Sequence, residues 1–418
     1  MTGMYPYTMI AEDPTTQVLL SWIDERDSAD GSEQTMVING ETVRTTGELI
    51  PASDEIDGSD GAYRYAGEVI DGLSPDTEYD VTIEDDTVGT TFTLPESWDG
   101  YEDGQMRLVL TSDWHIEGRN AYKHHAEDTR HMAAHEPHVF VFFGDHITSS
   151  LNMEAADAAE WLRLFREYYY EYLYDHGDRL MPAFHVPGNH EVGNHHWVGD
   201  DRSVDPRTGY FQFFFTSPPC LDPVGTNFGA VTVGEYLQLV GLDTHSARLD
   251  TETTPWLKGD ILDDDVDHIV AVQHAALLPG GDRRHTDFEY GENMLDAFGD
   301  IYYQQANLPA VFAGNVHSLK KTHPWKITDE EPAGEPGESY IALAGGEYVA
   351  RADDDPLAVV EYGDGYNPDR WDPDVAKKWY LERSSETGAH YNLTLGEDRY
   401  DVQEIDTSGR TLTSDRLV

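Results

Sequence analysis

Short apolar runs separated by polar residues and glycine are the main pattern of this chain from Met106 onward. Five of these runs are Arg107–Leu110, Val139–Phe143, Ala183–Val186, Ile269–Val272 and Ala310–Ala313. Short runs without polar alternation are typical of strands that are buried on both faces. Between the second and third runs, apolar residues recur at helical spacing and predict a helix over residues 154–175. Strands that alternate with helices predict a layered α/β fold.

Residues 1–96 carry a different pattern, in which alternating segments are separated by turns rich in glycine and aspartate. The predicted strands are Val18–Ile23, Thr35–Ile38, Ala62–Tyr65, Tyr79–Ile83 and Thr90–Leu94. They indicate a small all-β sandwich. In the segment Leu73–Tyr79, the tyrosine is placed to bond back to the preceding turn, and this stretch resembles a fibronectin type III domain. The polar residues 97–105 are the predicted linker to a second domain over residues 106–418.

The net charge is extreme. Eighty acidic residues against 27 basic ones leave a formal charge of -53. A folded protein this acidic repels itself in dilute buffer, and molar salt screens that repulsion almost completely. We therefore expect adaptation to a high-salt cytoplasm, as in halophilic archaea. Nucleic-acid backbones and anionic membranes are not expected partners, because binding them normally needs a basic surface.

Cysteine content and hydropathy exclude several other classes. Cys220 is the only cysteine, so an intramolecular disulfide and a cysteine metal cluster are both excluded. The first ten residues lack the basic and apolar regions of a signal peptide, and no stretch approaches the roughly 18 apolar residues of a membrane span. We expect a soluble, cytoplasmic protein.

Residues of the types that bind metals follow the apolar runs in a fixed order. They are Asp113-Trp114-His115, Gly144-Asp145, Gly188-Asn189-His190-Glu191, His274 and Gly314-Asn315-Val316-His317. Residues at the carboxyl ends of neighbouring strands in an α/β sheet converge on one crevice. Carboxylate, amide and imidazole groups that meet there are what a two-metal hydrolytic centre requires.

The order DxH, GD, GNHE, H, GxxH resembles the calcineurin-like metallophosphoesterase superfamily over about residues 106–412. The resemblance implies an α/β metallophosphoesterase sandwich of four α+β layers, and the preceding all-β domain is similar to that of purple acid phosphatases. It also implies two divalent metal ions, either manganese, iron, magnesium or zinc. One ion would take Asp113, His115 and His317, the other would take Asn189 and His274, and Asp145 would bridge them.

The same resemblance implies a mechanism. Water shared by two cations becomes hydroxide near neutral pH and attacks phosphorus, while the cations neutralise charge on the phosphoryl oxygens. Asp145 and His190 would be the catalytic residues. Asp145 would act as the bridging ligand, and His190 would bond a phosphoryl oxygen or protonate the leaving group.

Two positions depart from the family pattern. Asn315 stands where the last motif, GHxH, normally has its first histidine. Coordination through the amide oxygen of Asn315 would favour manganese, magnesium or iron over zinc; the alternative is a second site that binds its metal weakly. Thr148 stands where purple acid phosphatases have a tyrosine, so we expect no tyrosinate-iron colour.

Three functions follow from these patterns. The first is a metal-dependent phosphomonoesterase that acts on a small phosphate ester. The second is a phosphodiesterase, including one for cyclic nucleotides, because the ligand set does not separate the two. The third is a non-catalytic binding protein in which Asn315 marks a decayed second metal site. The N-terminal domain could shade the active-site mouth, pack a homo-oligomer or add stability, and its fold alone does not choose.

Overall fold

A computed structural model of the chain describes its structure over most of both predicted domains. The described residues are 4–24, 33–38, 40–46, 48–50, 63–115, 122–146, 167, 177–189, 229–242, 244, 253–259, 261–278, 294–315, 319–336, 339–343, 346–353, 355–363, 378–385 and 389–418. Except for residue 167, the helix predicted over 154–175 lies outside them, as does Cys220.

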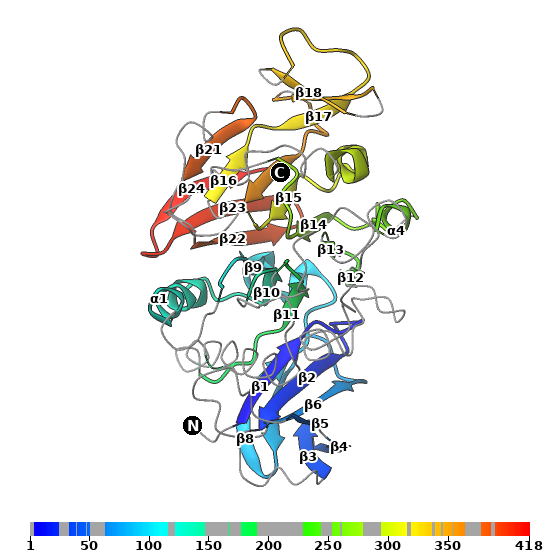
Figure 1. Cartoon of the computed structure of the whole chain (residues 1–418). Helices are drawn as coiled ribbons and strands as arrows, with labels where there is room; N and C mark the ends of the chain where they lie inside the picture. Colours follow the sequence, from blue (N-terminus) through cyan, green and yellow to red (C-terminus); the bar gives the residue numbers. More distant parts are fainter. Residues whose placement is uncertain are drawn as a thin grey trace.

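A ten-stranded sheet runs through much of the molecule (Figure 1). Its strands, in spatial order, are β24 (Thr411–Arg416), β23 (Arg399–Asp406), β22 (Ala389–Gly396), β9 (Met106–Thr111), β10 (Val139–Phe143), β11 (Ala183–Val186), β1 (Met4–Met9), β2 (Val18–Asp24), β6 (Tyr63–Ile70) and β5 (Glu48–Ile50). The central strands β9, β10 and β11 are parallel to one another, and β1 is parallel to β11. The outer strands pair in antiparallel fashion.

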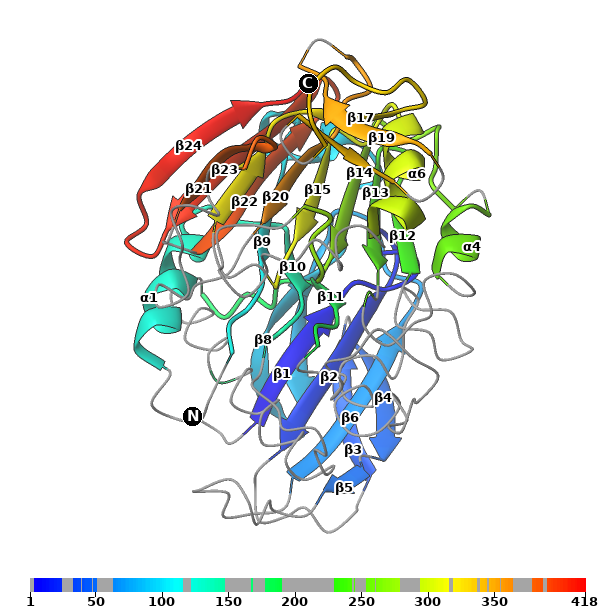
Figure 2. The same cartoon turned by 45° about the horizontal axis from the view of Figure 1, so that its top comes forward.

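A seven-stranded sheet forms the second large layer. Its spatial order is β12 (Gly229–Val233), β13 (Leu237–Leu242), β14 (His268–Gln273), β15 (Ala310–Ala313), β20 (Val360–Gly363), β16 (Leu319–Thr322) and β21 (Leu381–Ser385). Strands β13, β14, β15 and β20 are parallel, whereas β12, β16 and β21 pair in antiparallel fashion. Figure 2 shows the parallel strands of this sheet fanning out above the N-terminal strands β1, β2 and β6.

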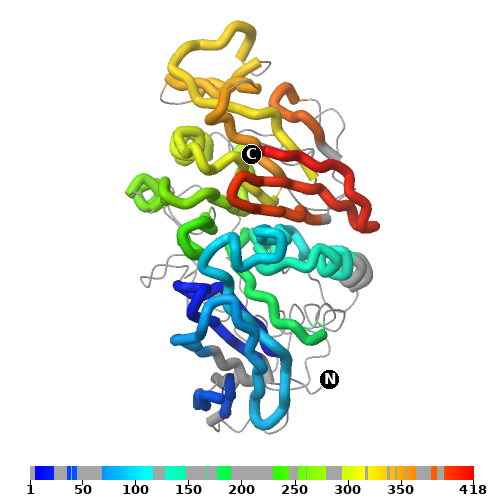
Figure 3. The backbone as a smooth tube through the Cα atoms, turned by 180° about the vertical axis from the view of Figure 1, so that it is seen from behind, coloured from blue at the N-terminus to red at the C-terminus, as the bar shows by residue number. Residues whose placement is uncertain are grey.

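Smaller elements complete the fold. A three-stranded sheet contains β17 (Trp325–Thr328), β19 (Tyr348–Arg351) and β18 (Tyr340–Ala342), and it lies at the end of the molecule opposite the N-terminal strands (Figure 3). In the part of the chain that the structure describes, the helical elements are α1 (Tyr122–Ala133), α4 (Thr254–Leu257), the π-helix η5 (Leu295–Gly299), α6 (Asp300–Gln304) and the 3-10 turns η1 (Trp98–Gly100) and η2 (Glu102–Gly104). Among the residues that the structure describes, no helix has the length and apolar character needed to cross a membrane.

Alternating side chains of the seven-stranded sheet fill two different cores. In β14, Val270 and Val272 belong to the core that the two large sheets share, whereas Ile269 and Ala271 belong to a second core with η5 and α6. The large sheets approach closely where β13 meets β11, because a Cβ on Gly241 would lie only 2.7 Å from Val186 Cγ2. Both faces of these parallel strands are therefore buried, as their short, mostly apolar runs predict.

The N-terminal strands are antiparallel and lie in two sheets. One set continues the ten-stranded sheet, and the other is a four-stranded sheet of β4 (Glu41–Thr46), β3 (Glu33–Ile38), β7 (Glu78–Ile83) and β8 (Asp86–Phe92). The predicted bond at the turn is present, since the Tyr79 hydroxyl accepts a hydrogen bond from Ser74 N at 2.7 Å. The small all-β domain is thus confirmed. Its likeness to fibronectin type III and the boundaries 1–96, 97–105 and 106–418 stay predictions.

The residues between the two predicted domains pack into the core. Trp98 and Tyr101 are buried; Trp98 Nε1 donates to Asp267 at 2.7 Å, and the hydroxyls of Tyr101 and Tyr236 lie 2.7 Å apart. One continuous apolar core joins the N-terminal strands to the large sheets. The polar composition of residues 97–105 predicts the turns there but not this packing.

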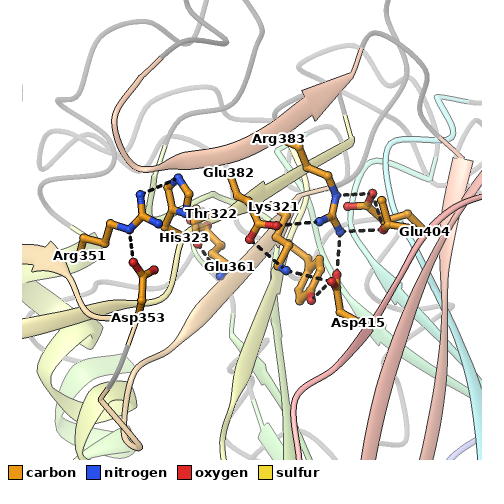
Figure 4. Close-up of polar contacts among 12 residues, drawn as sticks. Lys321, Thr322, His323, Arg351, Asp353, Glu361, Glu382, Arg383, Glu404 and Asp415 are labelled. Atoms are coloured by element: carbon orange, nitrogen blue, oxygen red, sulfur yellow. Dashed lines mark hydrogen bonds and ion pairs between the residues drawn. The ribbon is translucent and has the colours of Figure 1, made fainter.

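An ion-pair network holds the two large sheets together at one edge (Figure 4). Arg383 on β21 donates to Glu404 on β23 at 2.8 Å and to Asp415 on β24 at 2.7 Å. Lys321 on β16 lies 3.0 Å from the other oxygen of Asp415. Burial alone would raise the pKa of Asp415, but Arg383 and Lys321 lower it below the ordinary value. Glu404 and Asp415 come from one large sheet and Arg383 and Lys321 from the other, so these pairs form an electrostatic clamp between the two layers. Glu382, next to Arg383 on β21, also lies 3.0 Å from Lys321.

Replacing Arg383 with alanine should therefore destabilise the fold. We expect the free energy of unfolding to fall by about 2 kcal/mol, less than the ~3–5 kcal/mol of a fully buried pair, because the Arg383 side chain is 24% exposed. Urea denaturation at constant salt measures this loss.

Arg351 supplies the matched control, because its pair with Asp353 in the same region is about half exposed on both sides. The Arg351→Ala variant should lose less than about 0.5 kcal/mol. Equal losses in the two variants would contradict a specific clamp at Arg383.

Candidate metal centre

Strands of both large sheets deliver the candidate ligands to one place. Asp113 comes two residues after β9, Asp145 two residues after β10, and His274 directly after β14. In one sheet β9 and β10 are parallel to each other, and in the other β14 is parallel to both of its neighbours, so the carboxyl ends of these strands lie at the same edge of each sheet. The predicted strand runs coincide with observed strands, and the predicted convergence is present.

Three buried side chains form the centre of the cluster. One ligand atom from each of Asp113, Asp145 and His274 lies within 4.8 Å of the others, and His274 Nε2 is 3.2 Å from Asp145 Oδ2. Asp145 and His274 are almost entirely inaccessible to solvent. Two carboxylates this close are unfavourable in a buried place unless a positive charge lies between them.

The orientation of His274 suits a metal ligand. Its Nδ1 lies 2.9 Å from the carbonyl oxygen of Phe143, and because a carbonyl can only accept, Nδ1 carries the hydrogen. In the neutral ring, Nε2 is then left with its lone pair, and it faces Asp145 Oδ2 and Asn189 Oδ1, each at 3.2 Å. Acceptor atoms therefore face one another, and either a proton or a metal cation between them would satisfy this arrangement.

Three further predicted residues join this cluster. His115 Nε2 lies 3.6 Å from Asp113 Oδ1 and 3.7 Å from Asp145 Oδ2. Asn189 reaches His274 through its amide oxygen. Asn315 donates its backbone N–H to Asp113 Oδ2 at 2.9 Å. Six of the eight predicted site residues thus lie together, whereas His190 and His317 are outside the described residues.

Glycine precedes several of these residues because the ligands fill the space that a side chain would need. A Cβ on Gly314 would lie 2.7 Å from His274 Nδ1 and 2.9 Å from Asp113 Oδ2. A Cβ on Gly144 would overlap His274, and Gly144 also has a φ of +98°, which L side chains rarely adopt. The glycines of the GD and GN motifs are therefore required by close approach of the ligands.

Four site residues adopt left-handed backbone conformations. The φ values are 57° for Asp113, 45° for His115, 52° for Asp145 and 61° for Asn315. Such conformations cost on the order of 1–3 kcal/mol each and persist when surrounding contacts fix them. Here the loops brace one another, since Asp113 N donates to Gly144 O and His115 N donates to Asp145 O, both at 2.9 Å. The ligands are held in place before any cation binds.

The cluster attracts protons in the absence of a cation. Burial alone would lower the pKa of His274, but Asp145 and Asp113 raise it to about 10. Burial opposes protonation of His115 as well, and again the two carboxylates outweigh it and raise the pKa. A divalent cation would replace these protons as the positive charge of the site.

A buried ion pair supports the loop that carries His274. Glu361 accepts hydrogen bonds from Leu277 N at 2.7 Å and Leu278 N at 2.9 Å, and it lies 3.1 Å from Lys320 Nζ. Lys320 also donates to the carbonyl oxygen of Leu278. Both charged side chains are completely buried. This pair fixes the backbone just beyond His274.

Several supporting residues are not evident from the motifs. Ser112 donates a hydrogen bond to Asp113, and Thr244 accepts one from Ala275 N at 3.0 Å. Glu361 follows the apolar run Leu357–Val360, and a charged residue in such a place is a signal that could have indicated a buried pair; Lys320 lies in the polar strand Leu319–Thr322 and carries no such signal. Their partners are distant in sequence, so the motif order alone does not identify them.

The chain is similar to known proteins in sequence and in fold. The sequence matches the calcineurin-like phosphoesterase family over residues 106–319, just over half of the 418-residue chain. No curated protein matches it. Among solved structures, PhoD is similar over 99% of this chain and 88% of that chain, with 14% sequence identity and a TM-score of 0.61. GAP50, the anchor in the inner membrane complex of Plasmodium, is similar over 75% of this chain and 88% of that chain, with 13% identity and a TM-score of 0.42. The likeness to PhoD shows a shared fold.

The raised pKa of His274 predicts that cation binding depends on pH. A cation that binds at neutral pH must displace the His274 proton, so Mn²⁺ affinity should rise by about tenfold per pH unit up to about pH 9. At pH values below the pKa of His115, Mn²⁺ should also displace the His115 proton, so Mn²⁺ affinity should depend more steeply on pH there. Isothermal titration calorimetry in buffers of different ionisation enthalpy counts the protons released.

Mn²⁺ binding without proton release at pH 7 would contradict this expectation. The His274→Gln variant is the control, because it has no proton to lose at that position and should release about one proton fewer.

Proposed function

The chain belongs to the calcineurin-like phosphoesterase family and is a phosphoester hydrolase, and from this premise we propose that it hydrolyses small phosphate monoesters with two divalent cations. The observation that carries the proposal is the convergence of Asp113, Asp145 and His274 in one buried cluster. Carboxylate and imidazole groups are a fitting donor set for manganese, iron, magnesium or zinc.

We assign the two metal sites as follows. Asp113, His115 and His317 would hold one cation, Asp145 would bridge, and Asn189, His274 and Asn315 would hold the other. Bound there, the two cations would supply an activated water and would neutralise charge on the phosphoryl group. Asn315 in place of a histidine makes the second site richer in oxygen, which favours manganese, magnesium or iron over zinc.

The remaining tasks fall to other groups of the protein, both backbone and side chain. The carbonyl of Phe143 keeps Nε2 of His274 turned toward Asp145. His190, which follows Asn189 in sequence, would donate a hydrogen bond to a phosphoryl oxygen or a proton to the leaving group. Asp145 Oδ2 lies 3.7 Å from His115 Nε2 and 3.2 Å from His274 Nε2, and this position between the two proposed sites supports its assignment as the bridging ligand.

Charge supports a small monoester as the substrate. Two divalent cations against the carboxylates of Asp113 and Asp145 leave two positive charges, which match the two negative charges of an ionised phosphate monoester. The net charge of -53 disfavours polyanions such as nucleic acids, because they would be repelled from most of the surface.

The same net charge supports a high-salt setting as in halophilic archaea. Repulsion among the acidic residues has a range of about 10 Å in 0.1 M salt and about 3 Å in 1 M salt. The clamp of Arg383 and Lys321 is partly buried and therefore less screened than the surface repulsion. Salt should weaken the repulsion more than it weakens the clamp.

The function is tested with the full chain after removal of metal by a chelator. Adding Mn²⁺ should restore hydrolysis of p-nitrophenyl phosphate, and this monoester should be preferred over bis-p-nitrophenyl phosphate. Asp145→Asn should lower kcat/KM by more than about 100-fold, because loss of a bridging ligand exceeds the ~10–100-fold effect of outer-shell partners.

Asp353→Asn is the control, because this aspartate is 46% exposed and pairs with Arg351 away from the cluster. Activity that survives chelation and the Asp145 change would contradict metal dependence. A preference for the diester would leave the hydrolase in place and contradict the monoester assignment.

The salt proposal has a separate test. Raising KCl from about 0.1 to 2 M should raise Tm by several degrees as the Debye length shrinks. Sucrose at equal osmolality is the control, since it stabilises proteins by exclusion but does not screen charge. A Tm that is flat or falls with KCl would overturn adaptation to high salt.

A further inference from the structure

We propose that Tyr7, on the N-terminal strand β1, is a positioning residue for the metal centre and acts through His185 and His146 on the turn that carries Asp145. The inference rests on the proposed function, because it assigns Asp145 as the bridging ligand. It gives the N-terminal domain a part in metal binding.

Three buried side chains form a continuous hydrogen-bonded chain. The Tyr7 hydroxyl bonds His185 Nε2, and His185 Nδ1 lies 3.4 Å from His146 Nε2. Tyr7 and His146 are 0% exposed and His185 is 6% exposed. His146 directly follows Asp145, so the chain ends beside the proposed bridging ligand.

Aromatic packing fixes the two imidazole rings. Phe142 stacks on His185 with ring centroids 5.0 Å apart and an angle of 10° between the planes, and it meets His146 edge-on at 5.3 Å. Trp114, next to Asp113, packs edge-on against Phe142 at 5.5 Å. A movement of His185 would therefore displace Phe142 and, through it, His146 next to Asp145 and Trp114 next to Asp113.

Tyr7 lies on a strand whose backbone pairs on both sides. Strand β1 is held on one side by β2 over six residue pairs and on the other by β11, where Ile10 N donates to Ala183 O at 3.0 Å. Just before β11, Leu180 N donates to Thr90 O at 2.7 Å, and Arg179 lies over the ring of Phe92 at 4.1 Å. Contacts from the N-terminal domain thus hold the segment that leads to His185 and Asn189 in place.

The turn at Asp145 needs such support. Gly144 and Asp145 both have positive φ, at 98° and 52°. A strained turn keeps its shape only when its surroundings fix it, and His146 is the residue immediately after it. When both imidazoles are neutral, His185 donates through one ring nitrogen and accepts through the other, so each of its two bonds restrains the ring. Removing the Tyr7 hydroxyl removes one of these restraints.

The experiment compares Mn²⁺ affinity in Tyr7→Phe and in the wild-type chain by isothermal titration calorimetry. We expect Mn²⁺ to bind about tenfold more weakly in the variant, the range typical of residues that orient metal ligands. His185→Phe, which keeps a ring to stack on Phe142 but loses both hydrogen bonds, should weaken binding at least as much. The readout needs no turnover, so failure of the proposed hydrolysis would leave this test intact.

Tyr79→Phe is the matched control. Tyr79 is a buried tyrosine of the same domain whose hydroxyl bonds Ser74 in a turn, not a group near the metal centre. Tyr79→Phe should lower Tm by about as much as Tyr7→Phe does. Its Mn²⁺ affinity should equal that of the wild-type chain.

Three outcomes would overturn the proposal. The first is wild-type Mn²⁺ affinity in folded Tyr7→Phe or His185→Phe, and the second is an equal loss of Mn²⁺ affinity in Tyr79→Phe. The third is failure of both Tyr7→Phe and His185→Phe to fold, which would give the two residues a structural role only. If Mn²⁺ affinity falls as expected but the wild type hydrolyses neither nitrophenyl ester, the proposed function fails and the positioning role stands.

Discussion

The closeness of two buried carboxylates and an imidazole is the constraint on which this structure depends. Asp113, Asp145 and His274 come from loops of two different sheets, and their ligand atoms lie within 4.8 Å of one another. Buried carboxylates repel each other strongly, so this arrangement is stable only with a positive charge among them. Without metal the proton on His274 supplies that charge, as the raised pKa indicates. A divalent cation carries more positive charge than this proton. The same closeness of the side chains that requires a positive charge therefore also favours metal binding.

The surrounding structure holds these groups together against their repulsion. Backbone N–H groups of Asp113, His115 and Asn315 each bond a neighbouring loop of the site, so no loop can move alone. Glycines leave room for the ligands, and the Lys320–Glu361 pair fixes the chain beyond His274. Preorganisation of this kind places its energetic cost in folding and not in cation binding.

The sequence predicts the parts of this site that depend on local pattern. Each apolar run predicts its strand, because burial on both faces leaves a signal within four or five residues, and the ligand types follow each run directly. Strand β1 is not predicted, because Pro6 interrupts its short apolar stretch and proline within a run argues against a strand, and because its place beside β11 is set by pairing with distant residues. The bond between Tyr7 and His185 joins residues 178 positions apart, and no local pattern contains that information. The same holds for the clamp at Arg383, whose partners lie on strands of the other sheet.

Pairing between β1 and β11 has a consequence for the N-terminal domain as a whole. If β1 were removed, β11 would become an edge strand with unpaired backbone groups, and such a strand is prone to pair with a wrong partner. Strand β11 leads to Asn189 and carries His185, so a wrong pairing at that edge would displace residues that contact the metal centre. A domain attached through a flexible linker would have no such effect, because its removal would leave the large sheets complete. Here Trp98, Tyr101 and β1 tie the domain into the shared core, and the N-terminal strands are therefore part of the scaffold that keeps the ligands in place.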